Sequence, residues 1–117
     1  MPRLTWPEFT ELHRRAHLLI AVLPEEGPPG NVRQHVNLMA KLLHRLAKGD
    51  YALTINRQRQ FPEIHCAFER ETDAETIGRG VVAELQIDDQ RWLSRRWFNM
   101  DAAAFETIRD ALDAVRP

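Results

Sequence analysis

Two histidines offer the first chemistry that this chain could perform. His13 and His17 stand four residues apart, a spacing that lets two imidazoles on one helix reach the same metal ion. Arg14 and Arg15 lie between them, and no glutamate completes the His-Glu-x-x-His motif of zinc proteases. Two ligands do not make a site, so we expect no metal and no cofactor. A small metal-dependent enzyme built on this pair is the third of three functional hypotheses.

No other residue set has the spacing of a catalytic site. His65 and Cys66 are neighbours on a predicted strand, so they point to opposite faces and cannot act as base and nucleophile. Cys66 is expected to be a small core residue. The Gly-Arg-Gly of residues 78–80 lacks the Lys-Ser/Thr of a phosphate-binding loop, and Asp88 and Asp89 occupy a predicted turn. We therefore expect the protein not to be an enzyme.

The segment RWLSRRWFNM, residues 91–100, combines three arginines with three aromatic residues. If it forms a strand, Trp92 shares its face with Phe98 and Met100, which make the more apolar set. We therefore expect Trp92 to be buried against helices. A β-bulge near Ser94 or Arg95 would exchange the faces beyond it. The opposite face carries a basic and aromatic row that we predict to contact a partner, namely Arg91, Leu93, Arg95 and Trp97.

The sequence is compatible with three functions of this basic and aromatic row. Tryptophan and arginine are enriched among the anchors of protein interfaces, which favours a protein partner. The same side chains could stack bases and hold phosphates, together with Arg57 and Arg59 of a loop that is otherwise a polar hairpin end. In the third interpretation, the arginines only protect an edge strand from pairing. Because the adjacent residues 71–90 are acidic, we favour protein over nucleic acid.

The N-terminal half predicts two helices. Thr5 and Glu8 form a Thr-x-x-Glu capping box, and Pro7 suits a first helical turn. An apolar stripe then continues at helical spacing to the loop that begins at Pro24, through Phe9, Leu12, Ala16, Leu19 and Leu23. A second helix is expected from Asn31, as N-cap, to Gly49. The short connection predicts an antiparallel αα-hairpin over residues 1–48.

From residue 51 the apolar period changes to two, which predicts strands at residues 51–56, 64–69, 81–87 and 91–100. A second Thr-x-x-Glu box, Thr72 and Glu75, predicts a short helical turn between the second and third strands. A last helix is expected over residues 101–116. The predicted fold is one α+β domain, in which the helical hairpin and the last helix cover one face of a four-stranded antiparallel sheet at residues 51–100.

Length, charge and composition limit the classes of function that we expect of this chain. A chain of 117 residues suits one domain, and its net charge of -1 gives no overall attraction to nucleic acid or to anionic membranes. It has no apolar run of transmembrane length, no signal-peptide layout and one cysteine, so we expect a soluble cytoplasmic protein. The favoured function is a non-catalytic protein-binding module, an adaptor, inhibitor or regulator that binds another protein or itself through the sheet face or the helical hairpin. Nucleic-acid binding is the alternative.

Overall fold

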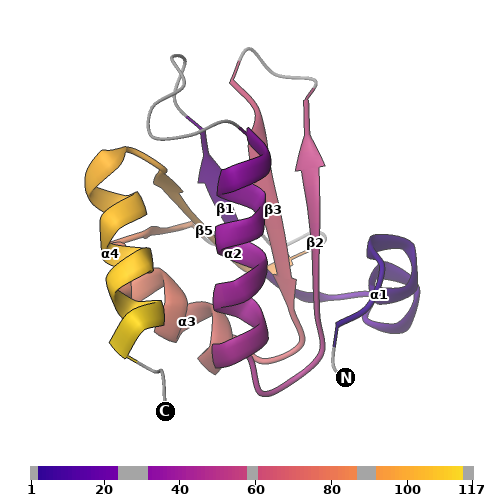
Figure 1. Ribbon diagram of the computed structural model, residues 1–117. Helices are drawn as coiled ribbons and strands as arrows, with labels where there is room; N and C mark the ends of the chain where they lie inside the picture. The colour runs from indigo at the N-terminus through magenta and orange to yellow at the C-terminus, as the bar shows by residue number, and fades with distance from the viewer. Residues whose placement is uncertain (1–2, 24–31, 58–60, 87–91, 115–117) are drawn as a thin grey trace.

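Nine elements make up the part of the chain that the computed structural model describes, residues 3–23, 32–57, 61–86 and 92–114 (Figure 1). In chain order they are α1 (Trp6–Leu12), β1 (Ala16–Val22), α2 (Val32–Leu46), β2 (Tyr51–Asn56), β3 (Glu63–Phe68), α3 (Glu71–Gly80), β4 (Glu84–Gln86), β5 (Trp92–Asn99) and α4 (Ala102–Ala114). The strands form a sheet in the order β2-β3-β1-β5-β4. β1 and β5 are parallel, and the other neighbouring pairs are antiparallel. The α+β class is confirmed, whereas the predicted four-stranded antiparallel sheet is wrong.

β1 is the element that the sequence pattern assigned to the wrong structure. Its residues continue the apolar stripe of the predicted first helix, yet they form the central strand of the sheet. Six of its seven side chains are buried, because both faces of a central strand are covered. A continuous apolar run satisfies helical and strand spacing equally well, so periodicity alone could not separate them. The predicted αα-hairpin of residues 1–48 therefore does not exist.

The start of the first helix is nevertheless as predicted. The Glu8 N–H donates to Thr5 Oγ1 at 3.3 Å, and the Thr5 N–H donates to Glu8 Oε1 at 3.0 Å, so the capping box is formed. α1 ends after seven residues, and the N–H of its C-cap His13 donates to the carbonyl oxygen of Phe9 at 2.8 Å. The box thus specifies where the helix begins and leaves its length undetermined.

α2, α3 and α4 lie on one side of the sheet, and α1 lies apart from them beyond β2 (Figure 1). α2 packs against α4, while α3 packs against β1, β3 and β5. The second helix was correctly predicted, although its expected N-cap Asn31 lies outside the described residues. The main apolar core fills the space between these helices and the sheet, and its largest fully buried side chains are Leu19, Met39, Leu43, Tyr51, Ile64, Cys66, Phe68, Met100 and Ile108.

The predicted β2-β3 hairpin and the last helix are also confirmed. β2 and β3 pair antiparallel over their full length, from Tyr51 opposite Phe68 to Asn56 opposite Glu63. α4 begins after Asp101, whose Oδ1 accepts the Ala104 N–H at 2.8 Å. In the part of the chain that is described, no helix is long and apolar enough to cross a membrane.

The segment between β3 and β5 is divided differently from the prediction. The expected helical turn is the ten-residue helix α3, and the capping box of Thr72 and Glu75 does not form because the helix already begins at Glu71. Of the predicted third strand, the described residues form only β4, since Val81 and Val82 belong to the turn that ends α3, and Ile87 lies outside the described residues.

Candidate functional site

A β-bulge at the start of β5 decides which face its side chains occupy. Ala16 of β1 is opposite Trp92, but the next residue, His17, is opposite Ser94, so Leu93 has no counterpart in β1. The bulge moves Trp92 away from the face of Phe98. The expectation that Trp92 is buried against the helices is therefore wrong. The bulge lies at Leu93, just before Ser94 and Arg95, where a bulge was considered as the condition that would change the faces.

All three tryptophans of the chain lie on the sheet face opposite α2, α3 and α4. Trp6 of α1 packs with Trp92, with ring centroids 6.0 Å apart, beside a small apolar cluster formed by Phe9 and three alanines. Further along β5, Arg95 lies beside Leu18 and Trp97 beside Ile20 of β1. The three indoles are neither fully buried nor fully exposed. We call this surface the tryptophan face and define it by Trp6, Trp92, Arg95 and Trp97.

The predicted row is thus only partly assembled. Arg95 and Trp97 share the face as expected, and Leu93, at the bulge, is 46% exposed. Arg57 is exposed at the end of β2. Arg59 and Arg91 lie outside the described residues. Because β4 pairs with residues 95–97, Arg95 does not lie on an edge strand, and edge protection does not explain it.

Two donors on this face are buried without an acceptor among the described residues. They are Arg95 Nε and Trp97 Nε1. A buried N–H group without a partner destabilises a fold, and such groups are rare in proteins. Arg95 and Trp97 therefore each keep one hydrogen-bond donor on this face that no described residue accepts.

A hollow of about 330 Å³ opens beside Trp97, between the turn after α3 and the start of α4. Its lining includes Gly80, Val82, Glu84, Trp97 and Asn99. Val82 is 85% exposed, the largest exposure of a large hydrophobic side chain among the described residues. The hollow thus joins the Trp97 end of the tryptophan face to an exposed aliphatic residue.

Val82 has a backbone conformation that valine rarely adopts. Its φ is 55°, in the left-handed region that favours glycine. The Val82 N–H donates to Arg79 O at 3.2 Å and the Ala83 N–H to Gly78 O at 2.8 Å, the two hydrogen bonds of a Schellman motif. Glycine usually occupies this position because a side chain there is strained. A strained, exposed β-branched residue beside a hollow suggests a function that local stability does not explain.

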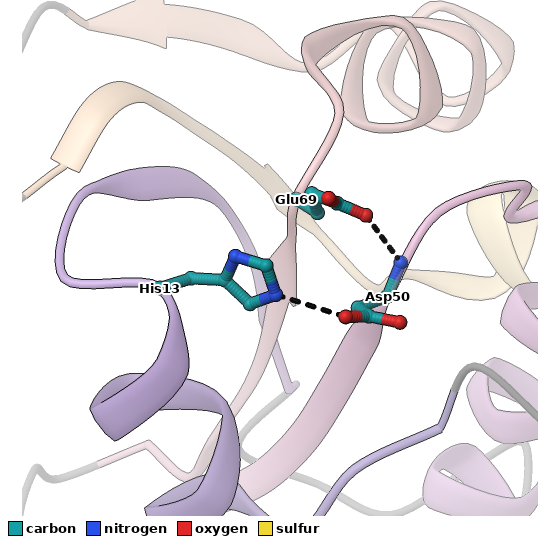
Figure 2. A group of neighbouring side chains, drawn as sticks. All are labelled: His13, Asp50 and Glu69. Atoms are coloured by element: carbon teal, nitrogen blue, oxygen red, sulfur yellow. Dashed lines mark hydrogen bonds and ion pairs between the residues drawn. The ribbon is translucent and has the colours of Figure 1, made fainter.

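His13, Asp50 and Glu69 meet at the end of the sheet near α1 (Figure 2). Each offers one ligand atom, and these atoms lie within 4.8 Å of one another. His13 Nε2 is 2.9 Å from Asp50 Oδ2, and the Asp50 N–H donates to Glu69 Oε1 at 3.0 Å. His13 and Asp50 are partly buried, whereas Glu69 is exposed.

His17 does not belong to this group, because it lies on β1 and not on the helix of His13. Its Nδ1 is 2.7 Å from Ser94 Oγ, which also accepts a hydrogen bond from Arg96 Nη1 at 3.0 Å. Burial lowers the pKa of His17, an effect that the carboxylate of Glu71 opposes and the Arg96 guanidinium reinforces. His13 and His17 therefore do not form the ligand pair of the metal-enzyme hypothesis, and His17 is part of a buried polar cluster.

His65 and Cys66 point to opposite faces of β3, as the alternation predicts. Cys66 is fully buried in the main core, and burial raises the pKa of its thiol to about 12, so it is not a reactive thiolate. His65 lies near Trp6, and its Nε2 is 3.0 Å from Glu63 Oε1. Cys66 therefore lacks the surroundings of a catalytic nucleophile.

Sequence reasoning found some of these features and missed others. It placed Arg95 and Trp97 together but missed Trp6 and the group of His13, Asp50 and Glu69, which come from separate segments. The only signal for that group in the sequence was the pair of carboxylates at the two ends of a predicted hairpin, which is common in sequences, because His13 lay inside a predicted helix. No family model, curated protein or solved structure matches the chain.

Proposed function

We propose that the chain is a protein-binding module whose contact surface is the tryptophan face. The observation that carries the proposal is the gathering of all three tryptophans and Arg95, half-buried, on the sheet face that α2, α3 and α4 leave uncovered. Tryptophan and arginine contribute most of the binding energy at many protein interfaces, because they bury large areas and also donate hydrogen bonds.

The hollow beside Trp97 supports a contact in which side chains of the partner insert into this surface. A volume of about 330 Å³ accepts one or two side chains of a partner. Val82 offers an aliphatic wall at its rim, and a partner that covers Val82 would bury apolar area that now faces water. The strained conformation at Val82 is then explained by binding.

The charge on this face favours a protein over a nucleic acid. Glu84 pairs with Trp97 in the sheet, and Glu63 shares the face with His65. Carboxylates next to the stacking residues repel phosphates, and a nucleic-acid site requires several cations along its path. Of the four arginines predicted to hold phosphates, the described residues include two, Arg95 on β5 and Arg57 at the end of β2.

The experiment compares two half-buried aromatic residues on opposite sides of the molecule. Immobilised wild-type chain, Trp97→Ala and Phe105→Ala are incubated with nuclease-treated and untreated lysate of the native host. Phe105 of α4 is the matched control, because it is also half-buried but packs on the helix side against His35. We expect a protein that the wild type and Phe105→Ala retain and Trp97→Ala loses.

Salt dependence and self-association complete the test. Retention by a protein interface with an aromatic anchor changes little with salt, whereas binding through phosphates weakens steeply. A dimer in sedimentation that Trp97→Ala dissociates would identify a second copy as the partner. The proposal is abandoned if Trp97→Ala and Phe105→Ala behave alike, or if nuclease removes all binding.

A further inference from the structure

We propose that His13, Asp50 and Glu69 form a binding site for a divalent transition-metal cation, with Zn²⁺ as the reference ion. This inference is independent of the protein-binding proposal. Imidazole nitrogen and carboxylate oxygen are the ligand types that zinc takes in proteins beside thiolate. One atom of each side chain already lies within 4.8 Å of the other two (Figure 2).

The distance between His13 and Asp50 is close to what a tetrahedral ion requires. Zinc bonds of about 2.0–2.1 Å place neighbouring ligand atoms about 3.3 Å apart. His13 Nε2 and Asp50 Oδ2 are 2.9 Å apart, so a slight opening of this contact makes room for the ion. Glu69 uses one carboxylate oxygen to accept the Asp50 N–H, which leaves its other oxygen for the cation.

The backbone holds the three residues in place. The Glu69 N–H donates to Asp50 O at 2.9 Å, which joins the start of β2 to the end of β3. Before Asp50, the N–H groups of Lys48 and Gly49 both donate to the buried carboxylate of Asp73 at 3.0 Å. A site whose ligands stand on a fixed backbone loses little entropy when the ion binds.

Gly49 is also required by this arrangement. A Cβ atom there would lie 2.8 Å from Glu69 Oε1 and 2.8 Å from Arg70 Cγ. The Glu69 carboxylate therefore folds across Gly49 toward Asp50. A larger residue at this position would push Glu69 away from the other two ligands.

Charge and burial also fit a cation. Two carboxylates and a neutral imidazole carry a charge of about -2, which a divalent ion neutralises. Phe9 packs on the His13 ring with centroids 4.8 Å apart, and Glu69 is exposed, so the ion would have one dry side and one open to water. Arg14 and Arg15 follow His13, but both are exposed, and water and salt screen their charge.

The chain contains a matched pair that lacks the third ligand. His65 Nε2 lies 3.0 Å from Glu63 Oε1, and the His65 side chain is 18% exposed, as is that of His13. No further carboxylate, histidine or cysteine of the described chain completes a group of three there. The two sites differ mainly in Glu69, so they separate metal binding from an ordinary histidine-carboxylate ion pair.

A bound ion would tie α1 to the sheet. His13 caps α1, whereas Asp50 and Glu69 flank β2 and β3. An ion that binds only the folded state raises its stability with concentration. Thermal unfolding therefore reports occupancy without any assay of function.

The test is titration calorimetry of the untagged, chelator-treated full chain with ZnCl₂, together with melting curves in zinc and in chelator. We expect one ion per wild-type chain and a zinc-dependent rise in melting temperature. His13→Ala and Glu69→Gln should each weaken affinity at least about tenfold, as is usual when metal-site residues are removed. His65→Ala should bind as the wild type does.

If His13→Ala does not fold, Glu69→Gln still tests the proposal. This variant should fold, because Glu69 is exposed and glutamine keeps an oxygen that accepts the Asp50 N–H. Circular dichroism verifies the fold of each variant. The proposal is overturned if the wild type shows no saturable zinc binding, if Glu69→Gln keeps full affinity, or if His65→Ala weakens binding as much as the other two.

Discussion

The two faces of the sheet are buried by different means. On the helix face, Leu19 is completely buried under α3, with its Cδ1 3.8 Å from the position of a Cβ on Gly78. On the tryptophan face, Leu18 and Ile20 are equally well buried, at 2% exposed, but their neighbours on β5 are the side chains of Arg95 and Trp97. Helices cover the helix face, whereas long side chains of the sheet itself cover part of the tryptophan face.

This difference shows which face is fixed and which can change. Helices are anchored by their own hydrogen bonds and by a core shared with α2 and α4, so the helix face can open only if the domain unfolds. A cover made of half-exposed side chains can rearrange by rotation about single bonds. A partner can therefore replace part of the cover on the tryptophan face without disturbing the helices.

The largest expected effect comes from adjacent leucines. Leu19→Ala should lower the free energy of unfolding by about 3–5 kcal/mol, because the rigid core under α3 leaves a cavity. Leu18→Ala should lower it by only about 2 kcal/mol, since neighbouring side chains can collapse into the space. Urea unfolding of both variants measures the difference. Equal losses would mean that the two faces are equally rigid.

Trp97→Ala should have a smaller effect on stability than on binding. The side chain is half-buried beside Ile20, so we expect a loss of about 1–2 kcal/mol in the free energy of unfolding. Iodide quenching of single-tryptophan variants checks the exposure directly, and Trp92 and Trp97 should both be partly quenched. Complete shielding of Trp97 would remove it from the proposed contact surface.

Val82→Gly should raise stability while it weakens binding. Glycine relieves the strain of φ 55°, and after its larger unfolded-state entropy is subtracted, a net gain of about 0.5 kcal/mol remains. The same change removes the aliphatic wall of the hollow. Chemical unfolding and the retention assay measure the two effects. A stabilised variant that binds normally would show that Val82 is not part of the contact.

The smallest effect is a pH dependence that distinguishes the two faces. His17 is buried on the helix face, and burial lowers its pKa below the ordinary value of 6.5. The unfolded chain then takes up a proton more readily than the folded chain, so stability declines as pH falls below about 6.5 toward the lowered folded pKa. Ser94, Arg96 and Glu71 surround the ring.

The measurement is urea unfolding at about pH 7.5 and about pH 5.5, on either side of the histidine range. His17→Gln should reduce the decline, and His65→Gln on the tryptophan face is the control. A decline that is unchanged in His17→Gln would assign the pH dependence to other groups.

Local signals predicted much of the fold. The capping box at Thr5, the helical spacing from Val32 to Leu46 and the alternation that begins at Tyr51 each predicted an element that the structure contains. The prediction failed at β1, where apolar residues on both faces remove the alternation that identifies a strand. It also failed at the end of α3, where Val82 occupies a glycine position and hides the stop signal.

The sequence by itself determined the α+β class, the start of α1, the position of α2 and the presence of arginine and tryptophan on β5. These depend on neighbours within a few residues, where backbone hydrogen bonds and side-chain spacing act. Only the tertiary structure decided that residues 16–22 form the central strand and that the bulge at Leu93 moves Trp92 beside Trp6. It also brought His13 to Asp50, 37 residues away. Such contacts depend on which strands pair and in what register, and pairing is decided by the burial of the whole sheet and not by any one segment.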